Sequence, residues 1–244
     1  FGHAAWFGAG AYAAALLATR LGLPMEVAIP AAPILAGAAA FLIGAVLVRL
    51  SGIYLAMLTL AVAQIAYAVA FQWVEVTGGD NGIVGVWPSA WAHTRTAYLL
   101  LSGALCALGI LALYRIIHSP FGAVLRAARD APLRAEAVGV DIRAARRLAF
   151  AVAGAAAGLA GALYAFSKGS IDPTTLSIAT SVDFLAMILL GGIGAVLGPV
   201  AGAAALHTVR DLVMPLTDYW RLLLGFSIIF MVLLFPRGLA GGRR

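Results

Sequence analysis

The stretch RIIHSPFGAVLRAARDAPLRAEAVGVDIRAARR, residues 115–147, is the one long polar interruption in an otherwise apolar sequence. It holds seven arginines against three acids, Asp130, Glu136 and Asp141. Because a charged side chain at mid-membrane costs about 3 kcal/mol or more, this stretch is expected to lie in water beside a bilayer. Its excess of arginine predicts the cytoplasmic side, since short cytoplasmic loops are rich in Lys and Arg.

The same stretch also predicts local structure. Ser119 and Pro120 are expected to begin a helix, and the run FGAVLRAARD after them places apolar residues at helical spacing. Pro132 is expected to begin a second short helix, which contains Glu136 and which Gly139 can end. Two short helices beside a membrane would form a docking surface. The plainer alternative is a solvated basic loop that only fixes topology.

The composition places the chain outside the range of soluble domains. It is 63% hydrophobic and 11% charged, with a mean hydropathy of +1.01, which indicates an all-α membrane protein with several spans. A β-barrel is excluded because the apolar runs are continuous over about 17 to 25 residues, whereas barrel strands alternate over about 10. The net charge of +6 indicates topology rather than a nucleic-acid partner, because the arginines gather on one side.

We expect one transmembrane domain over residues 1–244, a polytopic helical bundle with about eight spans. The sequence begins within a span, so the domain is expected to lack its natural N-terminal part, with one or more helices missing. The charges support the orientation, because eleven basic residues and three acids lie in the cytoplasm with the C-terminus, against five basic residues and seven acids outside. The expected spans are 4–19, 27–48, 53–73, 97–114, 148–166, 178–190, 196–213 and 219–235.

Small residues predict where the spans pack closely. Gly8 and Gly10 lie in the first span, and Gly154, Gly158 and Gly161 lie in the fifth. Such residues let helix backbones approach one another.

A glycine-rich turn is expected between the sixth and seventh spans, at Gly191, Gly192 and Gly194. Helices broken by glycine are tolerated at membrane depth only where they are packed in protein or line a cavity. This hairpin is therefore expected to be buried or to lie on a substrate path.

The longer loop at 75–96 is expected outside the cell. It carries the turn formers TGGDNG from residue 77 to 82. Trp73, Trp87 and Trp91 cluster around it, as an aromatic belt at a membrane interface would.

The expected spans carry no convincing central charge. Asp183, Arg210 and Asp211 all fall near predicted helix ends. Transporters driven by an ion gradient usually keep ionisable groups near mid-membrane, so we expect the driving force to come from a partner.

Catalytic and metal-binding patterns are missing from the sequence. No nucleophile elbow, P-loop or HExxH motif occurs, so the chain is not expected to be an enzyme or an ATPase. His3 and His207 have no metal-like partners at helical spacing, so no zinc site is expected. Cys106 lies in an apolar run and is expected to be a buried, inert thiol.

The substrate path has only weak candidates. Gln64 is the one strongly polar residue inside its span, and it could contact substrate or hydrogen-bond between helices. The turn glycines could equally serve tight packing. The candidates are Gln64, Gly78, Gly79, Asn81, Gly191, Gly192 and Gly194.

Several motifs, in order along nearly the whole chain, make the sequence resemble the LivM-type permease subunits of bacterial ABC importers for branched-chain amino acids. They are GHAAWFGAGAY at 2–12, SGIYLAMLTLA at 51–61, TGGDNGI at 77–83, SPFGAVLRAARDAPLRAEAVGVD at 119–141, LAGALYA at 159–165, LLGGIGAVLGPVAGA at 189–203 and FPRGL at 235–239.

The resemblance implies a type II ABC importer permease in the bacterial inner membrane. Its implied partners are a LivH-like permease, two LivG/LivF-like cytoplasmic ATPases that bind ATP-Mg, and a periplasmic substrate-binding protein, with no cofactor in this chain. Residues 135–139 are similar to the coupling segment of ABC permeases, although Gly139 comes sooner than in the usual pattern. The expected ATPase-coupling residues are Arg126, Arg129, Asp130, Glu136, Ala137 and Gly139.

Other functions stay open at this point. Similar permeases for urea or short amides fit the same sequence. A stand-alone channel or a structural membrane subunit belongs to a different class, and an intramembrane enzyme fits least because the spans lack catalytic pairs.

Overall fold

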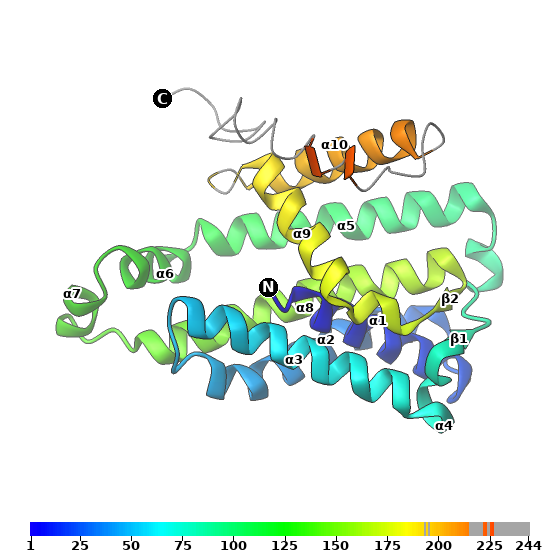
Figure 1. Ribbon diagram of the computed structural model, residues 1–244, viewed down its shortest axis with the longest axis horizontal. Coiled ribbons are helices and arrows are strands. Elements are labelled where there is room, and N and C mark those ends of the chain that lie inside the picture. Colours follow the sequence, from blue (N-terminus) through cyan, green and yellow to red (C-terminus); the bar gives the residue numbers. More distant parts are fainter. Residues whose placement is uncertain (193, 195, 215–221, 224, 227–244) are drawn as a thin grey trace. The chain divides into compact units, whose positions relative to one another are not determined.

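The computed structural model describes residues 1–192, 194, 196–214, 222–223 and 225–226. It forms two compact units, Phe1–Ile178 and Ala179–Arg244 (Figure 1). The elements of the first unit are α1 (His3–Thr19), α2 (Met25–Leu47), α3 (Ile53–Gln72), α4 (Val74–Thr77), η1 (Gly79–Asn81), β1 (Ile83–Val84), η2 (Ala90–Ala92), α5 (Arg95–Ile117), α6 (Pro120–Asp130), α7 (Pro132–Ala137), α8 (Ile142–Lys168), β2 (Ser170–Ile171) and η3 (Pro173–Leu176). Two further helices are α9 (Ile178–Gly191) and α10 (Gly198–Val213).

Helix α8 packs against both α1 and α2, and the three helices form the centre of the first unit. A Cβ added to Gly10 would lie 2.3 Å from the Cα of Gly158, and one added to Gly161 would lie 1.9 Å from the carbonyl oxygen of Phe7. On the α2 side, a Cβ on Gly154 would lie 2.3 Å from the Cβ of Ala40. The predicted close packing at these glycines is confirmed, and larger side chains would push the backbones apart.

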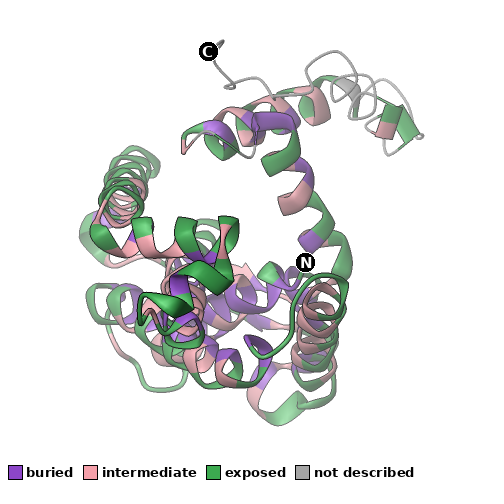
Figure 2. Cartoon of the chain, turned by 90° about the vertical axis from the view of Figure 1, so that its left-hand side faces the viewer, coloured by how far each residue is buried: buried purple, intermediate pink, exposed green. Residues whose placement is uncertain are grey.

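Alanines fill most of the space that the glycines leave. Ala11 and Ala14 on α1 and Ala32 and Ala40 on α2 are fully buried. Figure 2 shows such buried residues inside the bundle and exposed residues on its outward faces. Without a hydrophobic driving force between helices in lipid, this dense van der Waals packing is what holds them together.

Helices α3 and α5 lie at the edge of the bundle. Only Ala63 and Ala70 of α3 and Tyr98 of α5 are buried. Cys106 is exposed on α5, so the expectation of a buried thiol was wrong. It failed because an apolar run does not reveal which of its faces meets protein and which meets lipid.

Among the described residues, α2, α3, α5 and α8 are long and apolar enough to cross a bilayer. Helices α1, α9 and α10 are shorter, with 17, 14 and 16 residues. The expected eighth span, 219–235, lies almost wholly outside the described residues. Eight spans are therefore not confirmed, and their number stays a prediction.

Helix α8 begins six residues earlier than the span expected at 148–166. Its first residue is Ile142, and the Asp141 carboxylate accepts a hydrogen bond from the backbone N–H of Ala144 at 2.9 Å. This N-cap satisfies a donor that would otherwise be free at the helix start. Three arginines that the sequence placed in the polar stretch thus belong to the first turns of a membrane helix.

The loops at the opposite end of the first unit carry more structure than the sequence predicted. Strands β1 and β2 pair antiparallel with Ile83 opposite Ile171, and the N–H groups of Gly85 and Val86 both donate to the carbonyl oxygen of Gly169. We call residues 73–94 and 169–177 together the cap. Such short strands have no alternation pattern, so the sequence could not reveal them.

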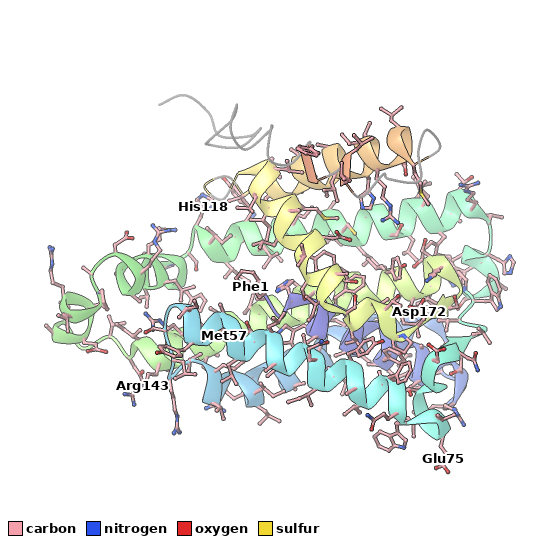
Figure 3. All side chains as sticks on the ribbon, viewed as in Figure 1. Phe1, Met57, Glu75, His118, Arg143 and Asp172 are labelled. Carbon is pink, nitrogen blue, oxygen red and sulfur yellow. The ribbon has the colours of Figure 1, made fainter. Side chains whose placement is uncertain are left out.

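Asp172 fixes the second half of the cap. Its carboxylate accepts hydrogen bonds from Lys168 Nζ at 2.7 Å and from the backbone N–H of Thr174 at 3.0 Å. Partial burial raises the pKa of Asp172, but the hydrogen bonds from Lys168 and Thr174 outweigh that effect and leave the pKa below its ordinary value. Figure 3 labels Asp172 and Glu75 at this end of the unit, and Arg143 and His118 toward the other.

In the second unit, α9 and α10 form a tight hairpin. A Cβ on Gly191 would lie 1.8 Å from the carbonyl oxygen of Gly198, and one on Gly202 would lie 1.9 Å from that of Met187. Leu190 and Leu206 are buried where the two helices meet. Gly191 and Gly202 therefore serve close packing.

The contact between α1 and α8 leads to a stability prediction. Gly10→Val should lower the free energy of unfolding by about 1–3 kcal/mol or more, because the added methyl groups have no space against Gly158. Thermal unfolding of the protein in detergent would measure it. Gly103→Val on α5 is the matched control, since a Cβ there meets nothing within 4 Å. Equal stability of the two variants would contradict the packing argument.

Candidate functional site

The segment 115–147 is folded at one end of the first unit (Figure 1). We call it the arginine-rich segment. Helices α6 and α7 pack with the start of α8 around a small core of Ala128, Ala135 and Ile142, which are 2%, 7% and 5% exposed, with Val140 against it. The prediction of two short helices is confirmed. A core of this kind gives the segment a defined surface that a solvated loop would lack.

Gly139 ends α7 in the way that the sequence predicted. Its φ is +88°, a conformation that only glycine adopts at little cost. The N–H of Gly139 donates to the carbonyl oxygen of Glu136 at 2.9 Å, and that of Val140 to Ala135 at 3.0 Å. This pair of bonds is a Schellman motif. It turns the chain so that Val140 returns to the small core.

Three arginines fasten the arginine-rich segment to the membrane helices. Arg126 Nη1 donates to the carbonyl oxygen of Ile117, the last residue of α5, at 2.8 Å. Arg147 Nε donates to the carbonyl oxygen of Phe41 on α2 at 3.1 Å, and its guanidinium lies 3.8 Å from the centre of the Phe41 ring. Arg146 Nη2 approaches the carbonyl oxygen of Ala128 at 3.4 Å. These contacts join α6 to α5 and α8 to α2 and α6, so the segment is connected to three membrane helices.

Arg129 and Asp130 form an ion pair on the surface of α6. Arg129 Nε lies 2.8 Å from Asp130 Oδ1, with side chains 75% and 61% exposed. The hydrogen bond from Arg129 holds the pKa of Asp130 below its ordinary value. Exposed pairs add little stability. Both side chains are therefore available to a partner.

The tip of the segment exposes two large apolar side chains. Leu133 is 81% and Val138 is 84% exposed, at the two ends of α7. Exposed apolar side chains beside polar ones make this tip a candidate contact surface. Neither residue was predicted from the sequence, although apolar residues flanking charged ones in a short helix were a usable signal.

The expected coupling residues are all exposed. All six lie on the exposed surface of α6, of α7 or of the turn after α7. They are Arg126, Arg129, Asp130, Glu136, Ala137 and Gly139.

Within the first unit, the expected substrate-path residues lie on α3 and in the cap. Gln64 lies exposed in the middle of α3 and makes no hydrogen bond to any residue that the structure describes. Gly78 and Gly79, with φ of +77° and +59°, form turns of the cap, and Asn81 is exposed there. These positions are explained by local backbone geometry, which leaves their contact with substrate untested.

The turn after α9 belongs to the second unit. Gly191 and Gly192 are buried and Gly194 is exposed. Gly192 has a φ of +101°. A role on a substrate path stays a prediction for these three residues.

No group of His, Cys, Asp and Glu within the described part of the chain has the geometry of a metal site.

Comparison with known proteins identifies the family. Residues 1–232 match the model of the branched-chain amino acid transport system permease component, so the chain belongs to this family. It is a multi-pass membrane protein. No solved structure gives a significant match.

Three curated relatives carry related names. The high-affinity branched-chain amino acid transport system permease proteins LivM of Escherichia coli and Salmonella typhimurium are 29% and 28% identical over 98% of this chain. A probable LivM of Methanocaldococcus jannaschii is 26% identical over 84% of this chain and 66% of its own length. The chain spans 62% of the length of the two bacterial relatives.

The turn at Gly139 leads to a prediction for local stability. Gly139→Val should speed hydrogen exchange of the Val140 amide about tenfold, because a branched side chain destabilises the left-handed turn by roughly 1–2 kcal/mol. Hydrogen exchange read by mass spectrometry would show it. Gly139→Asn serves as the control because Asn tolerates this conformation better. Unchanged exchange in Gly139→Val would mean that the Schellman turn does not hold α7 in place.

Proposed function

We propose that this member of the permease family is a membrane-spanning subunit of an ATP-driven ABC importer that carries branched-chain amino acids across the bacterial inner membrane. The proposal rests on the structure of the arginine-rich segment. It is folded and fastened to α2 and α5, and it presents two uncovered apolar side chains at its tip.

The arrangement suits force transmission from a partner. ATP binding would close two cytoplasmic ATPases, and the segment would move with them as a rigid body. Because Arg126 and Arg147 join the segment to α5 and α2, that movement would rock the membrane helices and switch access. The partners would be a LivH-like permease, two LivG/LivF-like ATPases that bind ATP-Mg, and a periplasmic substrate-binding protein.

The proposed substrate is leucine, isoleucine or valine, as the names of the relatives suggest. A transport pathway lined by Ala, Gly, Leu and Val would suit a partly apolar solute. Uptake competition in vesicles with the complete complex would test it, since urea or a short amide that displaces labelled leucine would point to a different substrate.

The tip of the segment yields a prediction for coupling. Leu133→Ser and Val138→Ser should each lower leucine uptake and substrate-stimulated ATP hydrolysis about tenfold, which is the usual loss at an interface anchor. Both side chains are exposed, so the amount of protein in the membrane should not change. Glu136→Ala and Gly139→Val should have a larger effect and abolish uptake.

Val84→Ser is the matched control for the coupling variants. Val84 is 72% exposed at the opposite end of the unit, in the cap. If the Leu133, Val138, Glu136 and Gly139 variants all transported like this control, the arginine-rich segment would have no coupling role.

The proposed orientation has a direct test. Cys106 is the only cysteine, so Cys106→Ala gives a background for single cysteines. In that background, an impermeant maleimide added outside spheroplasts should label Val84→Cys but not Val138→Cys, because the arginine-rich segment is proposed to lie in the cytoplasm. Labelling of Val138→Cys in intact spheroplasts would overturn the orientation.

A further inference from the structure

A cavity of about 580 Å³ lies where the cap meets the start of α5 and the end of α8. Its polar and aromatic lining residues are Trp87, His93, Arg95, Tyr98, Ser102, Phe166 and Ser167. None of the described residues that line it is acidic. Neither the proposed coupling role nor the proposed substrate path uses this cavity.

A second, apolar cavity of about 170 Å³ lies farther along the same two helices. Its lining includes Cys106, Gly109 and Leu113 on α5 and Ala156, Ala160 and Leu163 on α8. Space remains at Gly109, because an added Cβ would meet only a Leu159 methyl group, at 3.6 Å.

One hydrogen bond links the linings of the two cavities. Tyr98 lines the first, and its hydroxyl donates to the carbonyl oxygen of Leu163, which lines the second, at 2.6 Å. From Ser102 to Leu113 the axis of α5 runs about 17 Å at 1.5 Å per residue. That length is close to the roughly 15 Å of hydrocarbon in one leaflet of a bilayer. Taken as one site, the two cavities would form a groove with a polar head and an apolar tail of leaflet length.

The charge at the head of the groove points to an anion. Arg95 makes no ion pair with any residue in the described part of the chain. Its guanidinium stays charged at all relevant pH values and offers the fork of donors that matches a phosphate. His93 can add a second donor, and Ser102 and Ser167 can donate hydroxyl groups.

The same lining argues against a free amino acid as the occupant. An amino acid would bring an ammonium group with its carboxylate, and the lining residues include no carboxylate to pair with it. A phospholipid has the phosphate, the length and the apolar chain that the groove requires. Trp87 and Tyr98 are also residue types that favour the headgroup region.

We propose that the groove between α5 and α8 binds a phospholipid, with the phosphate at Arg95 and one acyl chain along Gly109. The lipid fills the space beside α5, which otherwise has little contact with the bundle. It thereby holds α5, and with it the α6 end of the arginine-rich segment, against α8.

Native mass spectrometry tests the headgroup contact. The protein is purified in detergent with the subunits that accompany it, stripped of lipid and titrated with palmitoyl-oleoyl phosphatidylglycerol. Arg95→Gln should bind this lipid about tenfold more weakly, because a charge-assisted hydrogen bond is lost. Arg20→Gln is the control, since Arg20 lies outside both cavities and donates instead to the carbonyl oxygen of Glu75. Equal binding by Arg95→Gln and Arg20→Gln would overturn the proposal.

A second set of variants and ligands tests the acyl-chain contact. Gly109→Leu should weaken binding of phosphatidylglycerol, because the new side chain fills the apolar cavity, whereas Gly103→Leu on the same helix should not. Dioleoylglycerol and inorganic phosphate, each lacking half of the ligand, should both bind more weakly than the phospholipid. Binding of inorganic phosphate at equal strength, or unchanged lipid binding by Gly109→Leu, would refute a lipid site.

Discussion

The close approach of α8 to α1 and α2 is the contact on which the rest of the first unit depends. In a bilayer the lipid tails are as apolar as leucine, so helices gain little from hiding apolar surface and associate mainly through dense packing. The glycines at 10, 154, 158 and 161 bring the backbones near enough for that packing. The peripheral helices α3 and α5 bury few residues.

Helix α8 also connects the two ends of the unit. It runs for 27 residues, about 40 Å at 1.5 Å per residue, from the arginine-rich segment to the cap. Asp141 caps its first turn, and Lys168 in its last turn pairs with Asp172 of the cap. A rod that is fixed at both ends and packed along its middle is suited to carry movement from one side of a membrane to the other.

The arginines of the segment act mainly through backbone carbonyl oxygens. Arg126, Arg146 and Arg147 all donate to such oxygens. Two of the acceptors, the carbonyl oxygens of Ile117 and Ala128, lie at or near the end of a helix. The last carbonyl groups of a helix lack partners within it, so a cation there satisfies them and stabilises the helix end. Arginines that the sequence identified only by their charge therefore also fix the geometry of the segment.

Much of this organisation follows from the sequence alone. Apolar runs long enough to cross a membrane, proline starts such as Pro120 and Pro132, and the glycine stop at Gly139 are local signals, because helix formation depends on neighbouring residues. The pairing of Ile83 with Ile171, the exposure of Cys106, and the cavity beside Arg95 came only from the tertiary structure. They depend on which distant segments meet, and in a chain where most residues are apolar, hydropathy does not distinguish a face against protein from a face against lipid.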